Sequence, residues 1–285
     1  MPRLLLAALI AVLFAYPSWA QNAEIVTTGP ENGSLIIIGG GRVPDNIMEE
    51  FRKRAGGDEA KIVVIPTASI TTGSIDSTRY FEYFGRYGFD DITIMHTSDP
   101  NVANQEEFYA PLKTATGIYF MGGRQWRIAD GFLNTKAQDE MFELLNRGGV
   151  IAGSSAGATI QGSYLARGDT KNNQIMMGDH EEGLGFVTNI AIDQHHLARN
   201  RIFDMFDILN NKPELLGIDI DEGTAMLVEG DEFEVIGDSY VVVYDGSFWS
   251  REGSDLKTLP PGEELFYFLR PGDHYNMRER KVVDR

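Results

Sequence analysis

Short apolar runs rich in β-branched residues alternate with longer stretches of helical spacing through the first half of the chain. In the stretches 46–54 and 77–87, apolar side chains recur every three or four residues, as at Tyr80, Phe84 and Tyr87, which predicts amphipathic helices. The apolar runs predict buried strands at residues 35–38, 62–65, 92–95, 117–121 and 150–152. This alternation is typical of an α/β fold, and we expect a three-layer sandwich in which helices cover both faces of a mostly parallel sheet.

The pattern changes after residue 196. A helix is expected at residues 198–209, followed by short strands at 216–220, 224–228, 234–236 and 240–244. Their close spacing predicts an antiparallel extension at the sheet edge, so that residues 21–285 form a single domain. Residues 246–285, which carry Pro260-Pro261-Gly262 and a charged end, are expected to be late surface structure or a loose tail.

Glycine-rich or polar turns follow most of the expected strands. They are Gly39-Gly40-Gly41, Thr67-Ala68-Ser69, Gly122-Gly123-Arg124-Gln125 and Gly153-Ser154-Ser155. The carboxyl ends of parallel strands share one edge of a sheet, so these turns should converge on one crevice. The first turn lacks the G-x-G-x-x-G spacing of a dinucleotide site, because Pro44 stands three positions after Gly41. No third ligand accompanies the adjacent His195 and His196, and we expect neither a cofactor nor a metal.

The segment Gly153-Ser154-Ser155-Ala156-Gly157 has the sequence of a nucleophile elbow. It lies between an expected strand and a helix-compatible stretch, and its glycines let the backbone turn sharply enough to expose the middle side chain, Ser155. The oxyanion of an attacked carbonyl needs two N–H donors. The candidates are Ala156 and, at the neighbouring strand end, Gly122 or Gly123, of which we choose Gly123.

A serine nucleophile also needs a base to remove its proton and an acid to orient that base. His195, at the end of an expected strand, is favoured over the adjacent His196, which would point the other way. Three carboxylates stand between two later strands, at Asp219, Asp221 and Glu222. Their positions in the sequence do not show which of the three is the acid that orients the histidine.

The N-terminus has the pattern of a secretory signal peptide. Arg3 precedes an apolar stretch from Leu4 to Phe14, and a small-x-small pattern ends at Ala20. We expect residues 1–20 to be removed and the protein to be exported, to the periplasm or the extracellular space, with no membrane partner after cleavage. The absence of cysteine excludes disulfides and thiol chemistry, and the net charge of −17 argues against a nucleic-acid partner.

Four motifs, in this order and spacing, resemble those of cyanophycinases, members of the serine peptidase family that also contains peptidase E. They are Gly122-Gly123-x-Gln125, Gly153-x-Ser155-Ala156-Gly157-Ala158, Asp193-Gln194-His195 and Asp221-Glu222-Gly223-Thr224-Ala225. The resemblance runs from about Gly33 to Tyr244. It implies a fold similar to class I glutamine amidotransferases, usually in a homodimer, and a triad of Ser155, His195 and Glu222.

The resemblance also implies substrate contacts. These are Gln125, Asp193, Gln194, Arg199 and Arg201. The family's substrate is cyanophycin, a poly-aspartate backbone with arginine on each side-chain carboxyl, which is cut to β-Asp-Arg dipeptides. Acidic or amide groups would hold its guanidinium groups, and arginines its free carboxylates. The chain departs from the family pattern at Arg124, where an acidic residue is usual, and at Asp204, where a third arginine is usual.

Together these features predict an exported serine exopeptidase that cleaves cyanophycin through an acyl-enzyme. The two departures leave open a related serine peptidase that acts on aspartyl or isoaspartyl peptides. The alternative from another class is a non-catalytic binding protein on the same scaffold, which the intact Ser155, His195 and Glu222 disfavour.

Overall fold

The computed structural model describes residues 26–70, 75–251 and 261–283, and contains two β-sheets. The expected signal peptide, residues 1–20, lies outside the described residues. None of the helices within the described ranges has the length and apolar character that crossing a bilayer requires.

The larger sheet has nine strands among the described residues, and its parallel part was expected. In spatial order they are β14 (Lys281–Val283), β13 (His274–Asn276), β10 (Glu232–Gly237), β9 (Thr224–Glu229), β1 (Ser34–Ile38), β5 (Val150–Ser154), β4 (Gly117–Phe120), β2 (Lys61–Ile65) and β3 (Asp91–Ile94). The strands from β1 to β3 in this order are parallel, whereas β9, β10, β13 and β14 are antiparallel additions beyond β1. The strands predicted in the first half of the chain are confirmed, with ends that differ by one or two residues.

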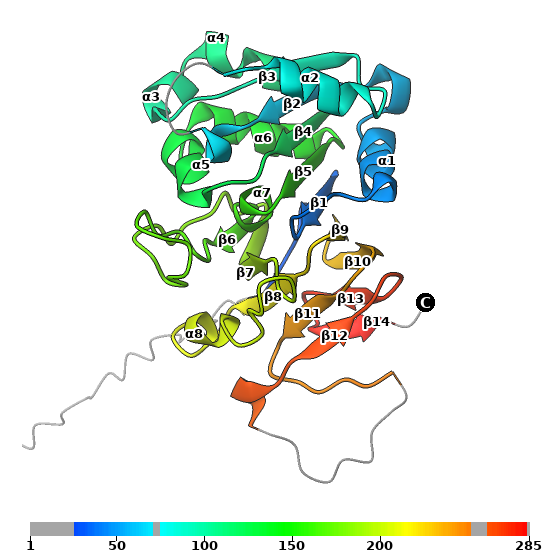
Figure 1. Ribbon diagram of the computed structural model, residues 1–285, viewed down its shortest axis with the longest axis vertical. Helices are drawn as coiled ribbons and strands as arrows, with labels where there is room; N and C mark the ends of the chain where they lie inside the picture. Colours follow the sequence, from blue (N-terminus) through cyan, green and yellow to red (C-terminus); the bar gives the residue numbers. More distant parts are fainter. Residues whose placement is uncertain (1–25, 71–74, 252–260, 284–285) are drawn as a thin grey trace, which may run out of the picture.

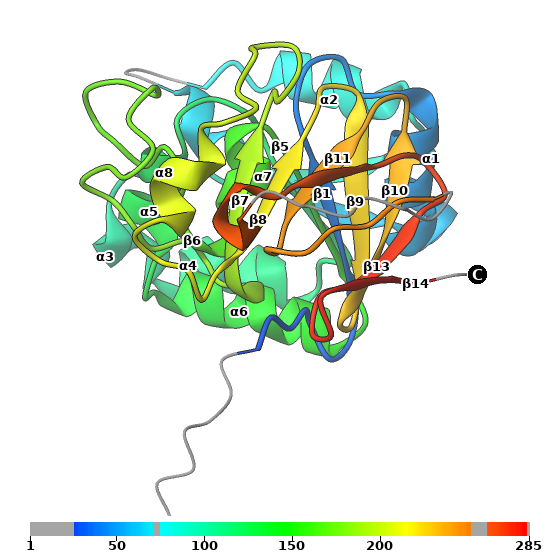
Figure 2. The ribbon, with the colours of Figure 1, turned by 90° about the horizontal axis from the view of Figure 1, so that it is seen from below.

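Helices cover both faces of this sheet. The α-helices are α1 (Asp45–Arg54), α2 (Thr78–Gly85), α3 (Pro100–Ala103), α4 (Glu106–Tyr109), α5 (Gln125–Phe132), α6 (Lys136–Asn146), α7 (Ala156–Thr159) and α8 (Met205–Leu209). Leu35 and Ile37 of β1 share a core with residues of α5, α6 and α7, whereas Ile36 and Ile38 share another with residues of α1 and α2. Successive side chains of a strand point to opposite faces, so the sheet separates two helical layers, as α2 and α6 show in Figure 2.

The smaller sheet corrects one expectation. Its strands are β12 (Tyr267–Leu269), β11 (Val241–Tyr244), β8 (Leu216–Ile220), β7 (Val187–Gln194) and β6 (Gly162–Tyr164), and Figure 1 shows β6 and β7 close to α7. The predicted edge extension is correct for β9 and β10 but wrong for β8 and β11, which pair here. All five residues of β8, Leu-Gly-Ile-Asp-Ile, are buried, so both faces of the strand are covered and its sequence does not identify the strands beside it.

Two other expectations differ from the structure. The helix predicted at residues 198–209 is reduced to α8, because Asn200 adopts a left-handed φ of 54° that interrupts it. The expectation of a loose tail at residues 246–285 is wrong, because β12, β13 and β14 belong to the two sheets. Tyr275 is fully buried, and the hydroxyls of Tyr267 and Tyr275 donate to Asp245 Oδ2 at 2.7 and 2.8 Å.

This packing predicts that the C-terminal strands contribute to stability. Tyr275→Ala should lower the free energy of unfolding by about 3–5 kcal/mol, because it leaves a cavity where a large aromatic side chain is buried. Phe268, which is 38% exposed, offers a matched control, and Phe268→Ala should cost clearly less. Denaturant unfolding measures both; equal midpoints for Tyr275→Ala and the unchanged protein would mean that these strands are dispensable.

Candidate active site

Ser155 occupies the sharp turn between β5 and α7. Its backbone has φ 57° and ψ −112°, a conformation that is rare for a residue with a side chain. The Ser155 N–H donates to the carbonyl of Ile38 at 2.9 Å, which ties the turn to the end of β1. The turn therefore has the strained geometry of a nucleophile elbow.

A hydrogen-bonded chain connects Ser155 to a histidine and a glutamate. Ser155 Oγ lies 2.9 Å from His195 Nε2, and His195 Nδ1 lies 2.5 Å from Glu222 Oε1. The His195 side chain is 6% exposed and that of Glu222 is 37% exposed. His195 directly follows β7, and Glu222 lies between β8 and β9. The three residues that the resemblance selected thus come together from both sheets.

The end of β1 positions all three segments. Three successive carbonyl groups there accept backbone hydrogen bonds. These are Ser155 N–H to Ile38 O (2.9 Å), His195 N–H to Gly39 O (3.0 Å) and Gly223 N–H to Gly40 O (3.1 Å). The sequence predicted that the triple-glycine turn lies in the same crevice as Ser155, but not that its carbonyl groups hold these three segments.

The same turn leaves room for the histidine and the glutamate. Gly40 and Gly41 have φ values of 112° and 66°, which favour glycine. A Cβ atom on Gly40 would lie 2.4 Å from His195 Cε1, and one on Gly41 would lie 2.5 Å from Glu222 Oε2. No larger residue fits either position without moving these two side chains.

Two backbone N–H groups near Ser155 are free to bind an oxyanion. Within the described part of the chain, neither the N–H of Gly123 nor that of Ala156 donates a hydrogen bond. The preceding Gly122 packs on the serine, since a Cβ placed on it would lie 3.3 Å from Ser155 Cβ. Both positions chosen from the sequence therefore remain candidates for the oxyanion site.

The other candidate acids have different partners. Asp219 is fully buried, and its Oδ2 lies 2.8 Å from His196 Nδ1 and 3.1 Å from the Tyr244 hydroxyl. Burial raises the pKa of Asp219 to about 6. Asp221 accepts hydrogen bonds from two backbone N–H groups, at residues 197 and 198, and from the Ser239 hydroxyl. His196 and Asp219 thus form a second histidine–carboxylate pair, whose side chains form no hydrogen bond with a serine among the described residues.

Asp193, a predicted substrate contact, is bound by an arginine of the chain itself. Arg167 Nε lies 2.8 and 2.9 Å from the two oxygens of Asp193, and Arg167 Nη2 lies 2.8 Å from Asp193 Oδ2 and 2.5 Å from Asp204 Oδ2. Arg167 is 1% exposed and Asp193 fully buried. No sequence signal singled out Arg167, which follows β6 in an irregular segment.

The remaining predicted contacts differ in their freedom to meet a substrate. Gln125 is buried and its amide nitrogen donates to the carbonyls of residues 166 and 167, whereas its Oε1 accepts no hydrogen bond among the described residues. Arg201 Nη1 donates to Gln194, at both the main-chain oxygen (2.8 Å) and Oε1 (3.2 Å). Arg199 is exposed and forms no ion pair within the described ranges. Arg124 donates to the carbonyl of Asp169.

Comparison with known proteins gives consistent results. The family model described as "Peptidase family S51" matches residues 35–236. The chain is 31% identical to a cyanophycinase of Geminocystis herdmanii, over 88% of this chain and 96% of that protein, and 30% identical to one of Trichormus variabilis, over 93% and 92%. A crystal structure of a peptidase from an acI-B1 Actinobacterium superposes with a TM-score of 0.62 at 25% identity, covering 87% of this chain and 98% of that one. The expected family and fold class are thereby confirmed.

The environment of His195 predicts the pH dependence of Ser155 reactivity. Burial lowers the pKa of His195 below its usual 6.5, Glu222 opposes this shift, and Arg199 adds to it. The neutral, proton-accepting form should therefore persist below pH 6.5. The rate at which a fluorophosphonate labels Ser155 should rise with pH around a midpoint below 6.5.

Arg199 provides the control for this profile. Arg199→Gln removes a positive charge and should move the midpoint upward, whereas Arg199→Lys should leave it in place. A midpoint at or above 6.5 in the unchanged protein would contradict the downward shift of the His195 pKa, and a profile that is flat from pH 5 to 8 would contradict the assignment of His195 as the base.

The close approach of Gly40 predicts a second effect. Gly40→Ala should slow labelling of Ser155 by about 100-fold or more, because the new methyl group displaces the His195 ring, and a misplacement of about 1 Å has this effect. Gly148 also has a positive φ, of 88°, but open space around its Cβ position. Gly148→Ala adds backbone strain without a collision, and it should label at the normal rate; comparable slowing in both variants would point to strain alone.

Proposed function

Because the chain belongs to peptidase family S51 and is a serine-type peptidase, we propose that it hydrolyses cyanophycin to β-Asp-Arg dipeptides. The observation that carries the proposal is the hydrogen-bonded chain from Ser155 through His195 to Glu222. The similarity to two cyanophycinases over most of the chain supports the choice of substrate.

In the proposed reaction, Ser155 Oγ attacks a backbone carbonyl of the polymer while His195 Nε2 accepts its proton. Glu222 holds the ring through Nδ1 and stabilises the imidazolium. The N–H groups of Gly123 and Ala156 bind the oxyanion. His195 then gives the proton to the departing amine, which leaves an acyl-enzyme on Ser155. A water molecule, deprotonated by His195, attacks the ester, and collapse of the second tetrahedral intermediate frees the serine.

Arginines near the triad supply groups for the substrate's carboxylates. Arg199 is exposed, and Arg201 lies against Gln194, directly before His195. The free Oε1 of Gln125 can accept from a guanidinium group. In this proposal Asp193 does not bind the substrate, because both of its oxygens are already bonded to Arg167. Its role is to hold Arg167 in place.

The Arg167–Asp193 pair also favours a second candidate function. A guanidinium group of cyanophycin finds no accessible carboxylate at Asp193, whereas a plain aspartyl or isoaspartyl peptide needs only cationic groups for its carboxylates. We therefore retain a serine peptidase for short aspartyl or isoaspartyl peptides as the alternative.

Location and assembly complete the proposal. We propose export to the periplasm or the extracellular space, on the pattern of residues 1–20. There the enzyme would meet polymer released by other cells. We also propose a homodimer, which the resemblance to this family implies.

A substrate panel tests the two functions. The protein without residues 1–20 should release β-Asp-Arg from cyanophycin, and Ser155→Ala should reduce this rate by about three orders of magnitude or more, because residual catalysis comes only from binding and the oxyanion site. Chromatography of the products measures release, and circular dichroism confirms that the variant is folded. Turnover of β-aspartyl dipeptides with none of the polymer would establish the alternative; release that Ser155→Ala does not reduce would contradict the nucleophile.

A further inference from the structure

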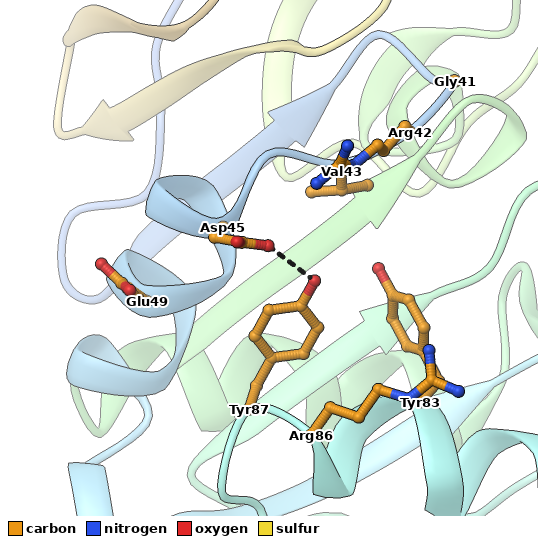
Figure 3. Close-up of a pocket in the computed structure, with 8 residues that line it drawn as sticks. All are labelled: Gly41, Arg42, Val43, Asp45, Glu49, Tyr83, Arg86 and Tyr87. Carbon is orange, nitrogen blue, oxygen red and sulfur yellow. Dashed lines mark hydrogen bonds between the residues drawn. The ribbon is translucent and has the colours of Figure 1, made fainter.

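A cavity of about 700 Å³ opens beside the triad, between α1, α2 and the turn that follows β1. This volume lies within the usual range of small-molecule sites. Its polar lining comes from Arg42, Asp45, Glu49, Tyr83, Arg86 and Tyr87. Figure 3 shows the hydroxyls of Tyr83 and Tyr87 pointing toward residues 41–43, and Tyr87 donates to Asp45 Oδ1 at 3.2 Å. The mechanism described above uses none of these six residues.

The cavity is continuous with the catalytic segment of the turn. Gly41 belongs to its wall, and the same residue packs on Glu222, since a Cβ on Gly41 would lie 2.5 Å from Glu222 Oε2. Gly40, one position earlier, packs on His195. The turn that contains Gly40 and Gly41 therefore packs on His195 and Glu222 on one side. On its other side it places Arg42 in the cavity.

Three of the four charged side chains in the cavity form no ion pair among the described residues. Arg42, Glu49 and Arg86 are exposed and form no ion pair within the described ranges. Two unpaired guanidinium groups from separate segments converge here although the whole chain has a net charge of −17. Two carboxylates of α1, at Asp45 and Glu49, line the same space. The cavity thus offers both signs of charge to a zwitterionic ligand.

We propose that this cavity binds repeating units of the polymer beyond the two that flank the cleaved bond. Arg42 and Arg86 would take the arginyl carboxylates of these units, and Asp45 and Glu49 their guanidinium groups. The inference rests on the proposed function, because it requires a polymeric substrate whose every unit carries one charge of each sign.

The distance from the nucleophile fits this assignment. Two hydrogen bonds, of 2.9 and 2.5 Å, and one imidazole ring separate Ser155 Oγ from Glu222 Oε1, and Gly41 lies directly beyond. An extended chain advances about 3.3–3.6 Å per residue, so a chain that passes around the turn needs at least about three backbone residues to reach the cavity. A substrate of only two units ends before it, whereas a long chain enters it.

Chain-length dependence tests the inference. The quantity to measure is the ratio of kcat/KM for long cyanophycin to kcat/KM for the two-unit oligomer (β-Asp-Arg)2. Arg42→Gln and Arg86→Gln should each lower this ratio by about 3–10-fold at low salt, through a higher KM for the long chain, and the loss should shrink as salt screens the charges. Arg270→Gln is the matched control. It removes the same charge from a cavity beside Trp249 and Asp273, and should leave the ratio unchanged.

Three other outcomes would contradict the proposed binding of polymer units in this cavity. An unchanged ratio in both cavity variants, or an equal change in Arg270→Gln, would overturn the subsite. An equal fall for both substrates would show that Arg42 acts on the triad through Gly41 and would also overturn it. If the unchanged protein cleaves aspartyl dipeptides but no polymer of any length, the proposed function fails, and this inference fails with it.

Discussion

Three consecutive backbone carbonyl groups at the end of β1 hold the site together. Those of Ile38, Gly39 and Gly40 accept from the segments that carry the serine, the histidine and the glutamate. Side-chain geometry in a triad has to be kept within fractions of an ångström. Here that precision comes from β1, a fully buried strand that is paired on both sides, and from its continuation into the turn.

This arrangement explains why both sheets are needed. Ser155 follows β5, which pairs with β1 in the larger sheet, whereas His195 follows β7 of the smaller one. Glu222 lies where the chain passes from β8 back to β9, beside β1. The smaller sheet places His195, and the β8–β9 crossing places Glu222, beside the same carbonyl groups. Ser155 and His195 both have positive φ values, of 57° and 59°, strain that the surrounding bonds maintain.

Features of the fold could be predicted from the sequence where a short stretch of residues determines them. The parallel strands followed from apolar runs, and the elbow followed from glycines around Ser155. The resemblance chose Glu222 over Asp219 and Asp221, and the observed His195–Glu222 bond agrees with that choice. Strand pairing after residue 196 could not be predicted, because β8 is buried on both faces and its sequence does not identify the strands that flank it. The role of Gly39-Gly40-Gly41 depends on contacts with residues more than 150 positions away.

Arg167 shows why charge at a site cannot be counted from motif positions alone. Asp204, which stands where the family usually has an arginine, suggests from the sequence a loss of positive charge. In the structure, Arg167 reaches between Asp193 and Asp204 from a different segment, and Arg201 lies 3.5 Å from Asp193. Two guanidinium groups thus face two carboxylates, and the local charge is balanced.

The pairing of Arg167 with Asp193 limits how the site can bind a guanidinium group of a substrate. Breaking a buried pair of this kind costs about 3–5 kcal/mol, so a substrate guanidinium cannot readily displace Arg167 from Asp193. In the proposed reaction, the substrate guanidinium group would be met by amide oxygens such as Gln125 Oε1, or by carboxylates that have no cation of their own. Glu49 is such a carboxylate, on the far side of the turn that holds the triad. Selectivity for an arginine-bearing chain is therefore expected to depend on units outside the immediate catalytic centre.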